Sequence, residues 1–273
     1  MPYEPHGVVL LSLLGSGTWF ARMGQDDHQS RRALRKDYQE VFPPYFRPIL
    51  LRMAESNGHG ISVLYGNYTI WNYAVGGAVC SNVLTPLFSV PDVVGGQTDW
   101  FIQDHVTNNG TKHQKLDMDP SEFVVVVYIG TNDVGIHSFV TDDESPEVSL
   151  ADLAGCQLQT IRNLYALGAR RFIVNSLIPL QITRLYSNSS DPTIYFPAPH
   201  DGVAWNKRMF NFVHSMNALI RGGVAALSEE WRGTATIDVF DTYGLFEDMY
   251  NHPSQWFNGS IPRERDGPLS SVP

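Results

Sequence analysis

From about residue 60 onward, short runs of β-branched and apolar residues alternate with longer amphipathic segments. Phe123–Ile129 is continuously apolar, which is typical of a strand in a parallel sheet that is covered on both faces. Three further runs, at 69–75, 171–176 and 236–240, have a similar composition, and each is bounded by glycine or short polar residues. The pattern predicts a strand at each of these four places.

Two segments between these strands have helical periodicity. Ser149-x-x-Asp152 resembles a capping box, apolar residues then recur at helical spacing, and Gly168 is the kind of residue that ends a helix. A second helical pattern covers roughly 203–231. Strands that alternate with helices indicate one α/β domain with a parallel sheet, and such sheets bind ligands at the carboxyl ends of their strands.

The apolar run Gly7–Leu14 allows two interpretations. It resembles the core of a secretory signal peptide, but no basic residue precedes it and no small-x-small cleavage site follows it. The same run has the composition of a buried strand. We interpret it as a strand and keep the signal peptide as the alternative.

The composition excludes several classes of protein. The chain has 273 residues, a formal net charge of −9 and 43% hydrophobic residues, which are the values of a folded domain. An acidic chain without a basic stripe is not expected to bind nucleic acid. No apolar run approaches the length of about 18 residues that crosses a bilayer, so no membrane span is expected.

The two cysteines and the glycosylation sequons bear on the compartment. Cys80 and Cys156 are too few for a disulfide scaffold, and the sequence leaves open whether they form one bond or remain two buried thiols. Four Asn-x-Ser/Thr sequons occur, at Asn67, Asn109, Asn188 and Asn258. They favour a secreted glycoprotein, so we expect an extracellular location.

Two of the predicted strands end in residues suited to ester chemistry. Gly130-Thr-Asn-Asp133 follows the valine-rich strand, where the amide of Asn132 can donate a hydrogen bond to an oxyanion. Gly76-Gly77 follows the strand at 69–75, where the N–H of Gly77 can serve as a second donor. Each segment alone is equally typical of an ordinary turn.

Five segments in this order resemble a known family, the GDSL/SGNH-type ester hydrolases, and within it the fungal acetylesterase-like group of carbohydrate esterase family 16. The segments are Asn72-Tyr-Ala-Val-Gly-Gly-Ala-Val-Cys-Ser-Asn82, Tyr128-Ile-Gly-Thr-Asn-Asp133, Leu164-Tyr-Ala-Leu-Gly-Ala-Arg-Arg-Phe172, Val239-Phe-Asp-Thr-Tyr-Gly-Leu-Phe-Glu-Asp248 and Asn251-His-Pro-Ser-Gln255. The resemblance covers roughly 60–260.

The resemblance implies a flavodoxin-like three-layer α/β/α sandwich with a parallel sheet. It also implies removal of acetyl groups from sugar hydroxyls through a serine acyl-enzyme. Carried over by motif, the oxyanion donors fall on Gly77 and Asn132. The implied substrate is an acetylated oligosaccharide or another small ester, the implied state is a monomer, and neither a metal nor an organic cofactor is implied.

The sequence departs from the family pattern at the nucleophile and at the base. No Gly-Asp-Ser occurs, and the nearest equivalent is Leu13-Leu-Gly-Ser-Gly17, which makes Ser16 the candidate nucleophile. No His follows an Asp by three positions. Asp248 and His252 are four apart, so we interpret them as a surface pair on one helix face. We therefore expect the activity of this chain to be impaired.

The same departures predict the domain boundaries. We expect an atypical N-terminal segment at 1–60, an SGNH-like domain at 61–260 and an unstructured polar tail at 261–273, so that the fold is incomplete at both ends. Two other functions stay open. One is a non-catalytic carbohydrate-binding module, and the other is an unrelated flavodoxin-like binding protein. The sugar-stacking residues of the module are then Trp71, Trp100, Trp205 and Tyr243.

Overall fold

The computed structural model describes residues 7–11, 61–65, 68–86, 90–107, 115–193 and 195–256. At its centre lies a six-stranded sheet with the order β2-β3-β1-β6-β7-β8. The strands are β1 (Gly7–Leu11), β2 (Ile61–Tyr65), β3 (Tyr68–Asn72), β6 (Phe123–Val127), β7 (Arg171–Asn175) and β8 (Thr236–Phe240). All pair in parallel except β2, which is antiparallel to β3.

The order of the strands creates a switch point at β1. The chain passes from β1 to β3 on one side and then to β6 on the other, so the carboxyl end of β1 lies between those of β3 and β6. A parallel α/β sheet binds its ligands at such a point. The α/β class and the parallel sheet are confirmed, and Gly7–Leu11 forms a strand as we interpreted it.

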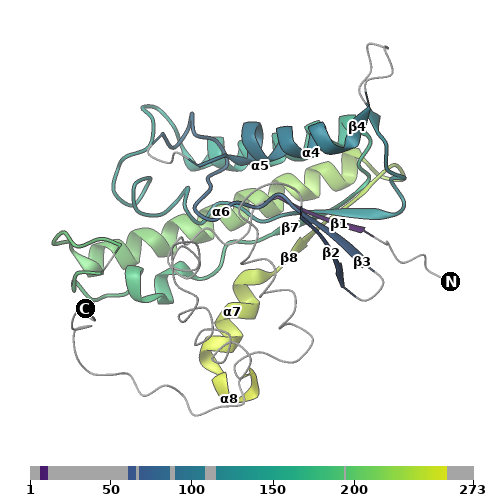
Figure 1. The fold of residues 1–273 in the computed structure, drawn as a ribbon. Coiled ribbons are helices and arrows are strands. Elements are labelled where there is room, and N and C mark those ends of the chain that lie inside the picture. Colours follow the sequence, from purple (N-terminus) through teal and green to yellow (C-terminus); the bar gives the residue numbers. More distant parts are fainter. Residues whose placement is uncertain are drawn as a thin grey trace, which may run out of the picture.

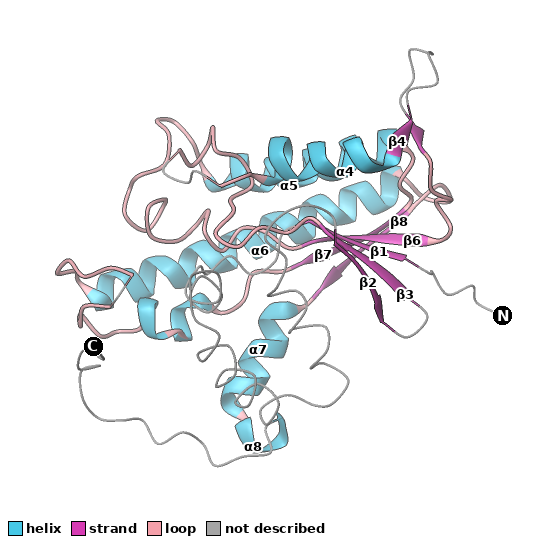
Figure 2. Ribbon diagram, in the orientation of Figure 1, coloured by secondary structure: helices cyan, strands magenta, loops and turns pink. Residues whose placement is uncertain are grey.

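The helices of the described part of the chain gather mainly on one face of the sheet. Figure 1 shows α4, α5 and α6 together on that face, whereas α7 and α8 lead away from the carboxyl end of β8 on the other side, and Figure 2 shows the strands between them. The helices are α4 (Thr98–His105), α5 (Leu150–Leu167), α6 (Gly202–Glu230), α7 (Thr242–Asn251) and α8 (Pro253–Trp256). Shorter elements are η2 (Val93–Gln97), η3 (Leu180–Ile182), η4 (Arg184–Tyr186), β4 (Val106–Thr107) and β5 (Lys115–Leu116).

The main core lies between the sheet and helices α4, α5 and α6. Phe123, Val125 and Val127 of β6 are buried, whereas the residues between them are only half-buried. The parallel register places Phe172 beside Val125 and Ile237 beside Phe172, and all three are buried. The apolar run predicted cover on both faces of β6, and the structure shows one face buried and the other half-buried.

α5 begins and ends where the sequence predicts. The carboxylate of Asp152 accepts hydrogen bonds from the N–H and the hydroxyl of Ser149, at 2.8 and 2.6 Å. Such contacts pair donors that the first turn of a helix leaves unsatisfied. Gly168 closes the helix with φ +121°. Local sequence chemistry therefore determines both ends of this helix.

α6 is much longer than the strands. Its 29 residues span about 43 Å, against about 17 Å for a five-residue strand. Near its middle, Asn217 accepts the N–H of Leu177 at 2.7 Å, just beyond β7. The first half of α6 therefore extends past the carboxyl edge of the sheet, where Arg208 pairs with Asp142. None of the described helices has the length and apolar character needed to cross a membrane.

Candidate active site

The chain leaves β3 through a tight turn at Gly76-Gly77. The N–H of Ala78 donates to the carbonyl of Val75 at 3.2 Å, and Gly77 has φ +85°. That backbone region favours glycine, because a side chain there is strained. A Cβ at Gly77 would meet no atom within 4 Å, and no acceptor in the described part of the chain takes the N–H of Gly77. Among the described residues, this N–H is therefore available as a donor.

Asn132 reaches this turn from the neighbouring loop. It follows β6, and its Nδ2 donates to the carbonyl of Ala78 at 2.8 Å across a sequence separation of 54 residues. The structure thus brings together the two segments that the sequence singled out. The side-chain amide has a second N–H that this bond does not use.

Gly130 determines how the chain turns between β6 and Asn132. It has φ +121°, and a Cβ there would lie 2.9 Å from Cδ1 of Leu177 and 3.0 Å from Nε2 of Gln157. The same Nε2 donates to the carbonyl of Ile129 at 3.2 Å. Both the backbone conformation and the space therefore require glycine at this position.

Asp133 is the site residue that the sequence reasoning missed. It is fully buried, and its Oδ1 accepts the N–H of Cys80 at 2.9 Å. Burial raises the pKa of Asp133 to about 7, against the smaller, opposite effect of the Cys80 hydrogen bond. Its Oδ2 has no partner among the described residues. The only signal in the sequence was an acidic residue directly after Asn132.

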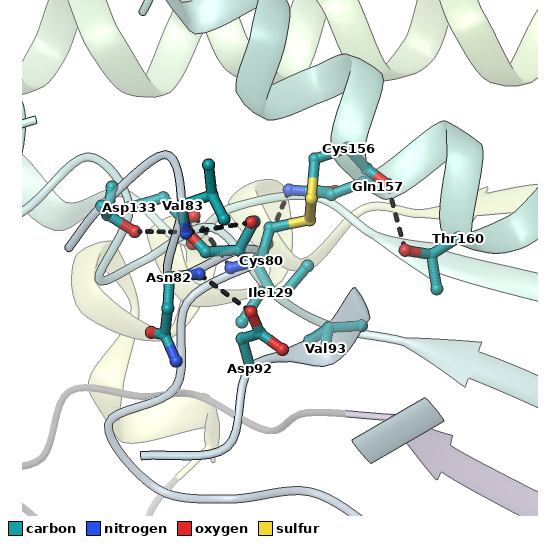
Figure 3. The surroundings of a disulfide bond; sticks show 12 residues. Cys80, Asn82, Val83, Asp92, Val93, Ile129, Asp133, Cys156, Gln157 and Thr160 are labelled. Atoms are coloured by element: carbon teal, nitrogen blue, oxygen red, sulfur yellow. Dashed lines mark hydrogen bonds between the residues drawn. A yellow bond between two sulfur atoms is a disulfide. The ribbon is translucent and has the colours of Figure 1, made fainter. Parts of the chain in front are cut away.

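A disulfide holds the same segment from the other side. Cys80 is bonded to Cys156 of α5, and Figure 3 shows this bond beside the contact between Cys80 and Asp133. The structure therefore decides between the two states that the sequence left open. The loop after β3 is attached covalently to α5 and by hydrogen bonds to the loop after β6.

A buried tyrosine supports the loop after β6. The hydroxyl of Tyr186 accepts the N–H of Ile136 at 3.0 Å, and a Cβ at Gly135 would lie 2.6 Å from that hydroxyl oxygen. Burial raises the pKa of Tyr186 to about 12, so the hydroxyl stays protonated at neutral pH. The loop is thereby anchored on both sides of Asn132 and Asp133.

Asp248 and His252 form a pair at the end of α7. Oδ1 of Asp248 lies 2.8 Å from Nδ1 of His252, and Nε1–H of Trp256 donates to Oδ2 of Asp248 at 2.8 Å. These two hydrogen bonds lower the pKa of Asp248. Both side chains of the pair are about half exposed. The interpretation of a surface pair on one helix face agrees with this geometry.

The nucleophile candidate and two of the sugar-stacking candidates remain to be placed. Ser16 lies outside the described residues. Trp205, offered as a sugar-stacking face, is instead 8% exposed and packed against Phe196 and His200, so it belongs to the core. Trp71 is half-buried with its ring against the edge of His105.

Comparison with known proteins identifies the family. The profile of GDSL-like lipases and acylhydrolases matches residues 45–260. The chain belongs to this family. GDSL-like proteins have the SGNH fold, so the family assignment agrees with the observed parallel α/β sheet and with the resemblance of the five sequence segments.

One curated protein is similar over much of the chain. An acetylesterase from Hypocrea jecorina is 24% identical over 210 residues, a match that covers 69% of this chain. The match covers 57% of that relative, so the chain spans little more than half its length.

The contact between Asn132 and Ala78 lies where a GDSL-like acylhydrolase needs hydrogen-bond donors. In the described part of the chain, no group of three or more His, Cys, Asp or Glu side chains is arranged to hold a metal ion. Polar groups at the switch point of the sheet are instead hydrogen-bond donors, namely the N–H of Gly77 and the amide of Asn132. Donors of this kind stabilise an oxyanion during acyl transfer.

Proposed function

We propose that this GDSL-like acylhydrolase is an ester hydrolase of the carbohydrate acetylesterase type. One observation carries the proposal, which is the hydrogen bond from Asn132 to the carbonyl of Ala78. It fixes a side-chain amide next to the turn of Gly77, with two N–H donors at one end of the sheet. The name of the acetylesterase relative supports acetyl esters as the substrate.

Ser16 is the proposed nucleophile. It follows β1 by five residues, and β1 ends between the strands that lead to Gly77 and Asn132. In the proposed reaction the Ser16 oxygen attacks the acetyl carbonyl carbon, and a base takes the hydroxyl proton. The sugar oxygen leaves with a proton, and water then hydrolyses the acetyl-serine to acetate. The N–H of Gly77 and the free N–H of Asn132 stabilise the oxyanion in both steps.

The general base of this mechanism has no candidate with the spacing that the family uses. No His in the chain follows an Asp by three positions, and the Asp248–His252 pair is solvent-exposed on α7. A serine without its base loses several powers of ten in rate, although the oxyanion hole alone retains some acceleration. We therefore propose a low turnover for this chain.

Acetate release from an acetylated oligosaccharide tests the proposal. Asn132→Ala removes one oxyanion donor, which should lower kcat by about 10²–10³ while KM changes little. Asn163→Ala is the matched control, because Asn163 is an exposed residue of α5 whose side chain accepts a hydrogen bond from Gln159, away from the site. Equal rates for the two variants would refute the role of Asn132.

The missing Asp-x-x-His pair favours a second candidate function, a carbohydrate-binding pseudoenzyme. Calorimetric titration with the same oligosaccharide separates the two functions. The pseudoenzyme binds saturably and releases no acetate, whereas the esterase releases acetate that depends on Asn132.

We further propose an extracellular glycoprotein with the flavodoxin-like three-layer sandwich of its family. The Cys80–Cys156 disulfide is typical of an oxidising compartment. The sequon residue Asn188 is exposed in an irregular loop, where an attached glycan has room. On expression through a eukaryotic secretory pathway, peptide N-glycosidase should lower the mass of the protein. In Asn188→Gln this mass decrease should be smaller by one glycan.

A further inference from the structure

Asp133 is a buried acidic residue that the proposed mechanism does not use. It is 0% exposed and directly follows Asn132. Burying a carboxyl group costs free energy unless hydrogen bonds compensate, and only one oxygen of this group has a partner among the described residues. The cost of burying Asp133 beside Asn132 therefore calls for an explanation, and the contacts of its carboxyl group suggest one.

Asp133 and Asn132 hold the loop after β3 at two points. Asn132 Nδ2 bonds to the carbonyl of Ala78 at 2.8 Å, and the Asp133 carboxyl accepts the N–H of Cys80 at 2.9 Å. Consecutive side chains of one loop thus bind alternate residues of the other. A single bond would let the segment pivot, whereas two bonds two residues apart fix both its separation and its orientation.

The remaining contacts of this segment lead elsewhere. The carbonyls of Val79 and Cys80 accept the N–H groups of Val93 and Val94, at 3.2 and 3.1 Å. The sulfur of Cys80 is bonded to Cys156. These contacts tie the segment to η2 and α5, and Gln157 of α5 bonds the carbonyl of Ile129 at 3.2 Å. Further along, Ser145 of the loop after β6 donates to the carbonyls of Val83 and Leu84, at 2.7 and 2.9 Å. At residues 78–80 themselves, the side-chain bonds from the loop after β6 in the described part of the chain are those of Asn132 and Asp133.

We infer that Asp133 is a positioning residue, whose carboxyl accepts the N–H of Cys80 and so sets the distance between the N–H of Gly77 and the amide of Asn132. The inference rests on the proposed function for what these donors do, but the hydrogen bond stands apart from it. Asp133 acts through the backbone of residues 78–80. Donors misplaced by about 1 Å cost roughly a hundredfold in rate.

The test compares two substitutions in the full-length chain. Asp133→Asn keeps the shape and an oxygen that accepts the N–H of Cys80, whereas Asp133→Ala removes the acceptor. Asp143→Asn is the matched control, since Asp143 is an exposed aspartate further along the same connection. Thermal unfolding first establishes that each variant is folded.

Acetate release supplies the first measurement. We expect Asp133→Ala to lower kcat about tenfold to a hundredfold with KM unchanged, and Asp133→Asn to stay within a few-fold of the parent chain. The control variant should match the parent. A folding defect alone would instead lower the amount of active protein in proportion to the unfolded fraction, which thermal unfolding detects.

Amide hydrogen exchange and the NMR signals of the Asn132 side chain supply a second measurement that needs no activity. In Asp133→Ala the N–H of Cys80 should lose protection and the Asn132 amide signals should shift, whereas in Asp133→Asn both should be retained. If the parent releases no acetate, this measurement alone decides the inference, and the proposed function fails separately. Folded Asp133→Ala with an unchanged Cys80 N–H, or Asp133→Asn as impaired as Asp133→Ala, would overturn it.

Discussion

At the scale of single residues, Gly130 is the position where the site depends most on the absence of a side chain. Gly130→Ala adds a methyl group that must displace Leu177 or Gln157 at a φ of +121°. We expect the free energy of unfolding to fall by about 2–4 kcal/mol, from backbone strain and overpacking together. Urea denaturation measures this loss.

Gly155→Ala provides the matched control for that experiment. Gly155 lies inside α5, and a Cβ there would meet no atom within 4 Å. Alanine is the better helix former, so this variant should gain about 0.5–1 kcal/mol. If both variants moved in the same direction, the packing argument for Gly130 would be wrong.

The raised pKa of Asp133, about 7, gives stability a pH dependence of known sign. Below about pH 4 the carboxyl is neutral in both the folded and the unfolded chain, so burial carries no electrostatic penalty. As the pH rises to 7, the unfolded chain ionises while the folded one stays protonated. This group therefore lowers the free energy of unfolding, by a few kcal/mol in order of magnitude.

Denaturation of the parent and of Asp133→Asn at pH 4.5 and pH 8 tests that dependence. The amide does not titrate, so the variant should become more stable relative to the parent as the pH rises. Asp143→Asn should follow the parent at both values. A constant difference between the parent and Asp133→Asn would show that Asp133 has an ordinary pKa in the folded chain.

At the scale of elements, the disulfide is the strongest single attachment of the loop after β3. It joins residues 76 apart in sequence and so restricts the unfolded chain considerably. Replacing both Cys80 and Cys156 by Ser should lower the free energy of unfolding by about 2–5 kcal/mol. Reductant should destabilise the parent similarly and leave the double variant unaffected, and a parent insensitive to reductant would contradict the prediction.

The sequence predicts those elements whose signals are local. α5 follows from its capping residues Ser149 and Asp152 and from Gly168, and β6 follows from its unbroken apolar run. β2 and α4 were not predicted, although the partner of β2 is β3, which begins only three residues after β2 ends. Both elements are short and carry weak periodicity of their own. α4 begins directly after η2, which Asp92 caps through the N–H groups of Gly95 and Gly96.

In the candidate site, too, the residues with a local signal were the ones that the sequence predicted. Gly77 and Asn132 were found because glycine and asparagine at strand ends are visible in the sequence. Three features could not be predicted from the sequence, because they depend on the pairing of β1 with β3 and β6 in space. They are the contact between Asn132 and the turn of Gly77, the hydrogen bond from the N–H of Cys80 to Asp133, and the state of the cysteines. An aspartate next to an asparagine carries no sign of whether it is buried.

At the scale of the whole molecule, we predict a monomer. The net charge of −9 makes copies of the chain repel one another at neutral pH. The most exposed large apolar side chains of the described part, Val83, Val203 and Tyr250, come from different elements. Light scattering after size exclusion of the deglycosylated protein should give a mass near 30.6 kDa. A mass of twice that value would contradict the prediction.

The two-point attachment between the loops after β3 and β6 has a consequence for loop engineering. Because Asn132 and Asp133 bind residues 78 and 80, the two loops share one register. Inserting or deleting a residue at 79, or inserting one between 132 and 133, puts one partner out of reach whatever the new side chains are. Libraries that alter substrate choice should therefore keep the length of both stretches and vary the chain outside them.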